Sequence, residues 1–385
     1  MKILIAASPF ATLSARRTCE IAQQAWASVR PDDSLTVRPV SDGRPNSDGL
    51  SGLHEVIGGV EVDPNEVDYS LCAEDLAGVA RERAHIWRSD SSALIDCTGI
   101  VGYTGAGALS SDFLGAELAW AKREGLSEVI IVLPTLSDID DLGRGMLSVL
   151  SGIRAPEDAA DEGDFLVSAV AAAREKLGAM RLITLAADAQ HLTGFSGVAR
   201  AHMRYGLDPQ VAQDLDARIG EYAESLTDAY EKSLGSSLFL SAHESPSPRG
   251  ESAGAGGGLA FVIQCLGGAL YSVGDLTVRS RLNTQIRESD LVVYISGAIE
   301  ADLPSGLLAA LDIADNEPPV VLVYDYGAIA KGELKQLGLS GAYELRPHLS
   351  FLDGTSPSDT DESAGQELEE VLRQRIATVG RTWGW

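Results

Sequence analysis

Four short apolar runs along the chain are rich in β-branched residues, and turn-forming residues follow each of them. They are Lys2–Ala7, Glu128–Leu133, Asp290–Ile295 and Val320–Tyr324. Strands that are buried on both faces of a parallel sheet have this composition. Helical patterns lie between the runs, at Ser14–Val29, Phe113–Glu124, Asp208–Leu234 and Ser305–Ala314. The alternation of strand and helix predicts an α/β fold in which these four strands share one largely parallel sheet.

Two further strand candidates, Ala93–Cys97 and Leu182–Ala186, indicate a second α/β lobe in the middle of the chain. A chain of 385 residues is also long for one hydrophobic core, because single cores stop growing at roughly 250–300 residues. We therefore predict two lobes. The first is Rossmann-like and comprises residues 1–60 and 255–385 together with 120–150; the second is inserted and comprises mainly residues 61–254.

Two segments have the composition of loops. Ser245–Gly257 is rich in glycine, proline and serine, so we expect a hinge between the lobes there. The polar, acidic residues 350–365 predict a mobile loop. A final amphipathic helix is expected near Gln366–Thr378.

Charge and cysteine content narrow the classes of partner. The net charge is −26, from 56 acidic and 30 basic residues, and no cluster of Lys and Arg is present. Nucleic acids and anionic membranes are therefore not expected partners, since both bind basic surfaces. The four scattered cysteines form no Cys-x-x-Cys pair, and the start of the chain is too short for a signal-peptide core. We expect a reduced, cytoplasmic protein that binds a small molecule.

A glycine-rich segment, Gly254-Ala255-Gly256-Gly257-Gly258, leads directly into an apolar, helix-compatible run. Helix interiors disfavour glycine, so these residues need a reason. One reason is that bare backbone lets a phosphate or carboxylate approach the N–H groups at a helix start. The other is close packing of the helix on its neighbour, and the sequence of the loop alone favours this second reason.

The glycine segment and the Leu266-Gly267-Gly268-Ala269-Leu270 that follows its apolar run closely resemble the C-terminal region of bacterial type I glycerate kinases. The resemblance implies a two-lobed glycerate-kinase-like fold and phosphoryl transfer from ATP, with Mg²⁺, to glycerate. It implies that Gly254, Gly256, Gly257 and Gly258 bind the cofactor. It extends in order over nearly the whole chain, carried by framework glycines and apolar strands.

The first strand and the loop after it resemble the start of that family, but with altered charges. Phe10, Leu13 and Ser14 match, whereas Ser8 replaces an Asp and Ala11 replaces a Lys. Ligands of open α/β sheets bind at such strand ends, so the resemblance makes Ser8 a substrate-binding candidate. Ser14 is placed to cap the following helix.

Asp42-Gly43 remains from the family's Ala-Asp-Gly-Gly-Glu-Gly-Thr segment, and Arg44 follows it. Asp-Gly pairs are common in turns. The resemblance nevertheless makes Asp42 a catalytic candidate, and Arg44 offers a cation for a carboxylate.

An acidic segment follows the strand at 128–133. Ser137, Asp141, Gly143 and Gly145 match the family, and Asp140 replaces an Asn. Asp138, Asp140 and Asp141 bring three carboxylates within four positions, which would suit Mg²⁺. Capping of the next helix is favoured over metal binding, because acidic first turns are common. The resemblance also makes Asp141 a substrate-binding candidate.

The middle lobe contributes Asp188, which follows the strand candidate at 182–186 and matches the family. We expect Asp188 to orient or deprotonate the glycerate hydroxyl, although a turn-capping role is equally compatible with the sequence. Arg204 occupies the region of the family's Pro-Gln-Lys-Gly and is a substrate-binding candidate. His191 and His202 have no companion that would suggest more than a structural role.

Near the C-terminal end of the 290–295 strand, Gly297 matches the family and is a cofactor-binding candidate. Ala298 replaces a Glu and Glu300 replaces an Arg. Inversion of charge matters in phosphoryl transfer, where catalysis depends on positioning and on neutralising phosphate charge.

Three interpretations stay open. The first is an ATP-dependent kinase of glycerate or a related small hydroxy acid. The second is a catalytically degenerate relative that binds a metabolite or a protein partner between the lobes. The third, an NAD-dependent dehydrogenase, lacks Gly-x-Gly-x-x-Gly after the first strand. The first two predict a cleft between the lobes lined by Ser8, Asp42, Asp141, Asp188, Gly256, Gly257 and Gly297.

Overall fold

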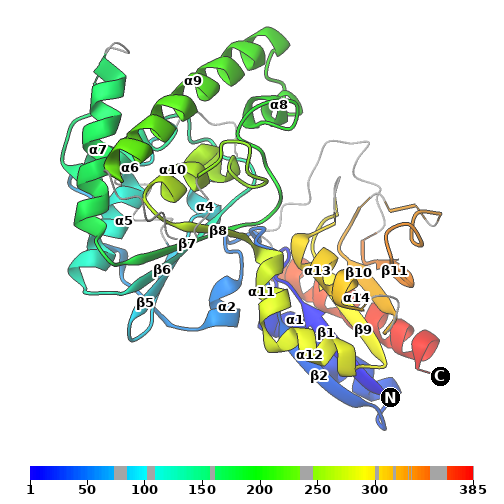
Figure 1. Cartoon of the computed structure of the whole chain (residues 1–385). Coiled ribbons are helices and arrows are strands. Elements are labelled where there is room, and N and C mark those ends of the chain that lie inside the picture. The colour runs from blue at the N-terminus through cyan, green and yellow to red at the C-terminus, as the bar shows by residue number, and fades with distance from the viewer. Residues whose placement is uncertain are drawn as a thin grey trace. The chain divides into compact units, whose positions relative to one another are not determined.

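The computed structural model describes residues 1–72, 85–101, 109–156, 161–234, 246–299, 303–314, 318–327, 329–330, 332–346 and 362–384. The chain divides into two compact units, each with its own sheet (Figure 1). Unit 1 consists of Met1–Ile57 and Val273–Trp385, and unit 2 consists of Gly58–Ser272. In the described residues, no helix is both long and apolar enough to cross a membrane.

Unit 1 is a five-stranded, wholly parallel sheet in the order β11-β10-β9-β1-β2. Its strands are β1 (Lys2–Ala7), β2 (Ser34–Pro39), β9 (Leu291–Ser296), β10 (Val320–Tyr324) and β11 (Gly341–Glu344). Its helices are α1 (Ala15–Val29), α2 (Leu53–Ile57), α11 (Val273–Arg279), α12 (Arg281–Glu288), α13 (Ser305–Ala314) and α14 (Glu362–Trp383).

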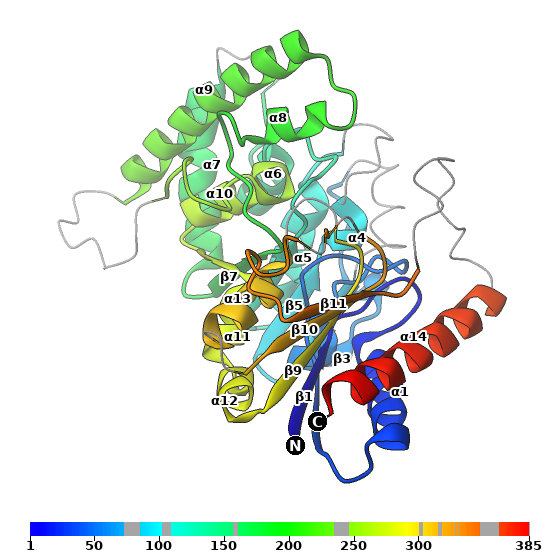
Figure 2. The same cartoon turned by 90° about the vertical axis from the view of Figure 1, so that its right-hand side faces the viewer.

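The central strands of unit 1 are apolar on both faces because helices cover both faces. Alternate residues of a strand point to opposite sides. Ile3 and Ile5 of β1 thus pack with α1 and α14, while Leu4 and Ala6 pack with α12 and α13. Figure 2 shows α1 and α14 on one side of these strands and α11, α12 and α13 on the other. The layers are those of a doubly wound α/β fold.

Unit 2 has a six-stranded mixed sheet in the order β3-β4-β5-β6-β7-β8. Its strands are β3 (Val60–Glu61), β4 (His85–Arg88), β5 (Ser92–Asp96), β6 (Glu128–Leu133), β7 (Arg181–Ala186) and β8 (Ala269–Ser272). The ladders from β5 to β8 are parallel, and those that join β3, β4 and β5 are antiparallel.

The helical segments of unit 2 are η1 (Pro64–Glu66), α4 (Thr98–Val101), α5 (Asp112–Arg123), α6 (Arg144–Ser151), α7 (Glu162–Leu177), α8 (Val198–Met203), α9 (Pro209–Ser233), η3 (Ala255–Gly258) and α10 (Leu259–Cys265). Those from α5 to α10 share one large apolar core with the sheet. Ile95, Val129 and Ile131 project from one face of the sheet into this core, where they meet residues such as Phe113 and Leu147.

The prediction that four named strands share one sheet is correct for three of them and wrong for β6. β6 pairs with β5 and β7 in unit 2. A strand that is apolar on both faces has the same sequence pattern in either sheet, so its local sequence does not say which sheet it joins.

The predicted lobe boundaries change accordingly. Residues 120–150 and 255–272 belong to unit 2, and the chain passes between the units after Ile57 and after Ser272. The expected hinge at Ser245–Gly257 is therefore wrong, because its described part lies within unit 2. The predicted mobile loop, 350–365, lies outside the described residues up to Asp361, and α14 begins at Glu362.

A carboxyl group is buried in the core of unit 2. Glu117 of α5 is 1% exposed, and the Tyr69 hydroxyl donates a 3.0 Å hydrogen bond to its Oε1. Its Oε2 has no hydrogen-bond partner among the described residues. Burial raises the pKa of Glu117 to about 8, against the opposing effect of the Tyr69 hydrogen bond. Near neutral pH the side chain is therefore mainly uncharged.

This raised pKa predicts that unit 2 loses stability as the pH rises. The folded state holds a proton that the unfolded chain has released above about pH 4.5, so the stabilisation falls as the pH rises toward about 8. Between pH 6 and pH 9 we expect the free energy of unfolding of the wild type to fall by about 2–3 kcal/mol from this group. Glu117→Gln should remove that part of the slope in urea-unfolding curves. An equal slope in Glu117→Gln and in the exposed control Glu175→Gln would contradict the assignment.

Candidate functional site

The carboxyl ends of β1 and β9 are where the strand order of unit 1 reverses direction. From β1 the chain moves to β2 at one edge, whereas β9, β10 and β11 extend toward the other. Open α/β sheets bind ligands at such a switch point. Ser8 and Gly297 lie there side by side: the Ser8 N–H and hydroxyl donate to the Ile295 carbonyl at 2.9 and 3.3 Å, and a Cβ on Gly297 would lie 3.1 Å from Phe10 Cβ.

Ser8 is 1% exposed, so its hydroxyl joins β1 to β9 rather than facing solvent. Asp42 is 3% exposed and has a similar role. It accepts hydrogen bonds from the Tyr294 hydroxyl at 2.5 Å and the Ser296 hydroxyl at 2.7 Å. Burial, and then the Asp42 carboxylate, raise the pKa of Tyr294 well above its usual range. Tyr294 therefore remains a proton donor to Asp42. That Ser8 and Asp42 act on a substrate stays a prediction.

The amino end of α1 begins just beyond this switch point and is occupied by the chain itself. The Ser14 hydroxyl accepts from the Arg17 N–H, which confirms the predicted cap. The Glu55 carboxylate of α2 accepts from the N–H groups of Ala15 and Arg16 at 2.9 and 2.6 Å. A helix start favours anions, and here an internal carboxylate fills the position that a ligand anion would take. No local signal in the sequence identifies Glu55, because its partners are forty residues away.

We expect Glu55→Gln to destabilise the protein by about 1–2 kcal/mol, since it removes the charge at the helix start and one of two acceptors. The shift in the urea midpoint of the full chain measures this. Glu20→Gln, an exposed change on α1, should lower the stability much less. Equal shifts for the two variants would show that the contact of Glu55 is not stabilising.

A second feature that the sequence did not reveal is an ion pair at the end of β10. Asp325 is 3% exposed, and Arg346 donates to both of its carboxylate oxygens. The Asp325 N–H in turn donates to the Gly297 carbonyl at 3.2 Å. Asp325 thus connects the loop after β11 to a predicted cofactor-binding position.

In unit 2, Asp188 follows β7 at the carboxyl end of the sheet, as predicted. Asp188 is half-buried. Its Oδ2 accepts a 3.1 Å hydrogen bond from the hydroxyl of Thr135, a residue that follows β6. At the end of β5 the buried Asp96 accepts from Thr98 through both the N–H and the hydroxyl. Three parallel strands therefore each present an oxygen-bearing side chain at the same edge of the sheet.

The glycine segment, Gly254–Gly258, is buried and folded against the chain around it. The N–H groups of Gly254, Gly256 and Gly258 donate to the carbonyls of Gln190, Pro134 and Gly254. A Cβ on Gly254 would lie 2.3 Å from the His191 carbonyl oxygen, and Gly256 has a φ of 62°. A side chain at Gly254 would clash with the backbone, and the left-handed conformation of Gly256 is one that glycine adopts most readily. The contacts favour the packing interpretation, and a role for Gly254, Gly256, Gly257 and Gly258 in cofactor binding stays a prediction.

Asp141 caps two helices at once. Its Oδ1 accepts from the Gly143 N–H at 3.0 Å, and its Oδ2 accepts from the Gly145 N–H at 2.9 Å, both at the start of α6. Oδ2 also accepts from the Ser111 N–H and hydroxyl and from the Ser110 hydroxyl, at the start of α5. The geometry favours capping over metal binding, the preference that the sequence indicated.

Asp140 is exposed, but the chain around it removes part of the water from its carboxylate. This desolvation, and to a smaller extent the negative charge of Asp141, raises the pKa of Asp140. In the part of the chain that the structure describes, no group of three or more His, Cys, Asp or Glu side chains is placed to hold a metal ion. That Asp140 and Asp141 bind Mg²⁺ stays a prediction. They do not form a cage for a resident metal.

We expect Asp141→Asn to lower the free energy of unfolding by about 3 kcal/mol, because an amide leaves donors at two helix starts without an acceptor. Asp140→Asn is the matched control and should change stability by about 0.5 kcal/mol or less. Urea unfolding of both variants tests the assignment. Similar losses for the two would show that capping is not the main role of Asp141.

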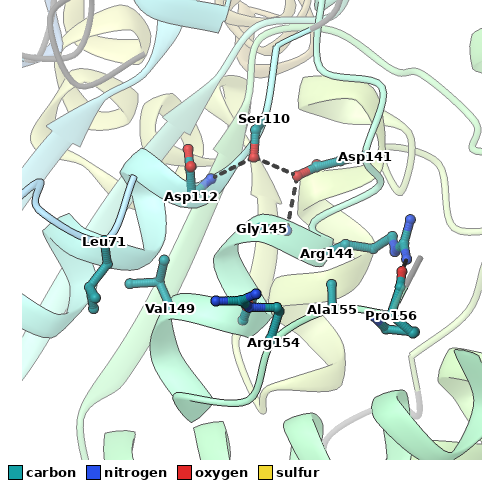
Figure 3. Close-up of a pocket in the computed structure, with 11 residues that line it drawn as sticks. Leu71, Ser110, Asp112, Asp141, Arg144, Gly145, Val149, Arg154, Ala155 and Pro156 are labelled. Atoms are coloured by element: carbon teal, nitrogen blue, oxygen red, sulfur yellow. Dashed lines mark hydrogen bonds between the residues drawn. The ribbon is translucent and has the colours of Figure 1, made fainter. Parts of the chain in front are cut away.

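A cavity of about 310 Å³ opens beside this double cap, wholly within unit 2. Figure 3 shows Ser110, Asp112 and Asp141 along one side and the side chains of Arg144 and Arg154 along the other. Leu71, Val149, Ala155 and Pro156 supply apolar lining. Asp141 is a site candidate from the sequence and also lines this cavity.

The remaining candidate, Arg204, is exposed at the carboxyl end of α8. The predicted cleft residues thus fall in both units. Ser8, Asp42 and Gly297 belong to unit 1, and Asp141, Asp188, Gly256 and Gly257 belong to unit 2. That they line one cleft stays a prediction.

Comparison with known proteins identifies the family of this chain and a solved structure of similar fold. Residues 3–380 match the model of the glycerate kinase family, so the chain belongs to that family. Its fold is similar to the crystal structure of a protein from Salmonella typhimurium LT2 assigned as glycerate kinase 2, with a TM-score of 0.67 and 19% sequence identity. The match covers 99% of this chain and 98% of that chain. Among curated proteins, none matches.

Proposed function

We propose that this protein transfers a phosphoryl group from ATP to a hydroxyl group of glycerate or a related small hydroxy acid. The observation that carries the proposal is the family match over residues 3–380. The family is one of kinases, which supports nucleotide use, and phosphoryl transfer needs a positioned acceptor hydroxyl and neutralised phosphate charge.

Asp188 is the residue we assign to the acceptor hydroxyl. Its carboxylate stands at the carboxyl end of β7, where open sheets bind ligands, and it is half-buried rather than enclosed. Thr135 holds one of its oxygens. In this position Asp188 would orient the hydroxyl and accept its proton as the oxygen attacks the γ-phosphorus.

Exposed Asp140 is the carboxylate that would hold the Mg²⁺ of the reaction, and the ion would supply positive charge that neutralises the phosphate groups. Gly297 and the segment Gly254–Gly258 are the proposed nucleotide contacts. Arg204 is a proposed contact for an anionic substrate.

A second function, binding without efficient catalysis, is favoured by a specific observation. Several groups that would handle charge are engaged with the chain itself: Ser8 bonds to Ile295, Asp42 to Tyr294 and Ser296, and Glu55 fills the start of α1. The family's Lys is replaced by Ala11 in addition. Each lost charge contact to a transferring phosphoryl group slows reaction on the order of a hundredfold.

We therefore expect slow turnover, below about 0.1 s⁻¹ against a median near 10 s⁻¹ for enzymes, in an ATPase assay coupled to a panel of small hydroxy acids. Mg-ATP should raise the thermal midpoint of the protein. Asp188→Asn should abolish the remaining turnover without lowering the midpoint, while Asp214→Asn, an exposed change on α9, should leave both unchanged.

The outcomes separate the two functions. Binding of Mg-ATP without any turnover supports the degenerate relative, and turnover at ordinary enzyme rates refutes it. Failure of Mg-ATP to stabilise the protein at all refutes the kinase.

A further inference from the structure

The loop between β7 and α8 presents an aromatic ring to solvent. Phe195 is 85% exposed, more than any other large hydrophobic side chain that the structure describes. The guanidinium of Arg200, on α8, lies over the ring, 5.5 Å from its centre. A cation in this position is attracted to the electron-rich face of the ring. Because most of the Phe195 side chain is exposed, the opposite face of the ring is open to a ligand.

The loop around Phe195 is fixed by hydrogen bonds on both sides of the ring. The Gln190 side-chain amide donates to the Ser196 carbonyl at 2.8 Å. The Gly194 N–H donates to the carboxylate of Asp216 at 2.9 Å, which ties the loop to α9. Helix α9 runs beside α8 (Figures 1 and 2). The ring of Phe195 is therefore presented by anchored backbone rather than by a loose loop tip.

Packing within the chain does not explain this exposed ring. A second cation–π pair in unit 2 shows the contrast: Arg174 of α7 lies 5.2 Å from the ring centre of Tyr230 on α9. Tyr230 is half-buried against the core, and Arg174 also donates to the Cys265 carbonyl at 3.1 Å, so that pair joins elements of the fold. Phe195 covers little of its surface with protein, and exposed apolar surface contributes little to folding.

The position of the loop favours a ligand. The loop leaves the carboxyl end of β7 and also carries Asp188, the residue proposed for the acceptor hydroxyl. Open α/β sheets bind ligands at this edge. The glycine segment proposed for the nucleotide adjoins the same loop, since the Gly254 N–H donates to the Gln190 carbonyl at 2.7 Å. Phe195 thus belongs to a loop that connects two parts of the proposed site, all within unit 2.

The chemistry around the ring indicates what kind of ligand it receives. Arg200 and Arg204 are exposed and four residues apart along α8 and its carboxyl end, so they lie on one face. In a protein of net charge −26, two such cations favour an anionic ligand. A nucleotide joins a flat base to anionic phosphates. A single ring suits a base better than a protein partner, because a stable protein interface covers about 800 Å² on each partner.

We propose that Phe195 is a stacking platform for the purine base of ATP, with Arg200 on the face of the ring opposite to the base. Stacking on an aromatic side chain needs only the flat face of the base. The inference rests on the proposed function for the choice of ATP as the nucleotide. It does not depend on phosphoryl transfer taking place.

Calorimetric titration of the full chain with Mg-ATP tests the proposal. Phe195→Ala should weaken binding about tenfold, the usual effect of removing one stacked aromatic side chain. Phe195→Leu keeps apolar volume without a π face and should weaken binding to a similar extent, whereas Phe195→Trp should bind at least as tightly as the wild type. Val60→Ala removes an exposed apolar side chain on β3, four strands away from β7, and should leave the affinity within twofold.

Inorganic triphosphate, which has no base, separates stacking from charge. Its affinity should be the same in the wild type and in Phe195→Ala, and Arg200→Gln should weaken the binding of Mg-ATP. An equal loss of affinity for Mg-ATP and for triphosphate in Phe195→Ala overturns the inference, because the effect would not pass through the base. Binding of Mg-ATP by Phe195→Leu as tight as that of the wild type also overturns it.

Failure of this inference can be told apart from failure of the proposed function. Mg-ATP binding that depends on Phe195, with no turnover of any hydroxy acid, supports the platform and counts against the kinase. Turnover with an unchanged KM for ATP in Phe195→Ala supports the kinase and overturns the platform.

Discussion

The carboxylate of Asp141 connects the starts of two helices, and much of the candidate site in unit 2 depends on it. Through five hydrogen bonds it holds Ser110 and Ser111 at α5 against Gly143 and Gly145 at α6. Helix starts leave N–H groups that need acceptors, and one ionised group here serves two helices. Because residues of both helices line the cavity, the same contact joins two sides of it.

The same principle recurs in unit 1, where the chain satisfies its own polar groups at the carboxyl ends of the strands. Buried polar groups without hydrogen-bond partners are costly in free energy. The polar side chains of a site without a permanently bound ligand therefore tend to form hydrogen bonds with other parts of the chain. Glu55 fills the start of α1, and Asp42 is held by Tyr294 and Ser296. These contacts stabilise the switch point of the sheet, and they engage the carboxylates of Asp42 and Glu55 with the chain itself.

Family membership and site chemistry therefore carry different information about this protein. The resemblance seen in the sequence is carried by apolar strands and by glycines, of which Gly254 packs closely against the His191 carbonyl. Such packing stabilises the fold and does not by itself depend on catalysis. Phosphoryl transfer depends on a small number of charges, and Ser8 and Ala11 carry none at the positions where the resemblance implies an Asp and a Lys.

The sequence by itself determined most of the elements near the site. The strands at 2–7, 128–133 and 320–324 lie where their apolar, β-branched runs predicted them, and Ser14 caps α1 as its position indicated. These are local properties, since burial on both faces and a hydroxyl before a helix are visible within a few residues. The alternation of strand and helix was enough to predict an α/β fold.

Tertiary structure alone decided which sheet each strand joins and which polar groups meet. β6 pairs with β5 and β7 because of hydrogen bonds to distant segments, and its own residues would suit either sheet. Three pairs likewise join distant residues: Asp325 and Arg346 are 21 positions apart, Glu55 and Ala15 are 40 apart, and Glu117 and Tyr69 are 48 apart. A side chain's sequence neighbours determine its local conformation, whereas its partner across the fold determines whether its charge is buried, neutralised or free to bind a ligand.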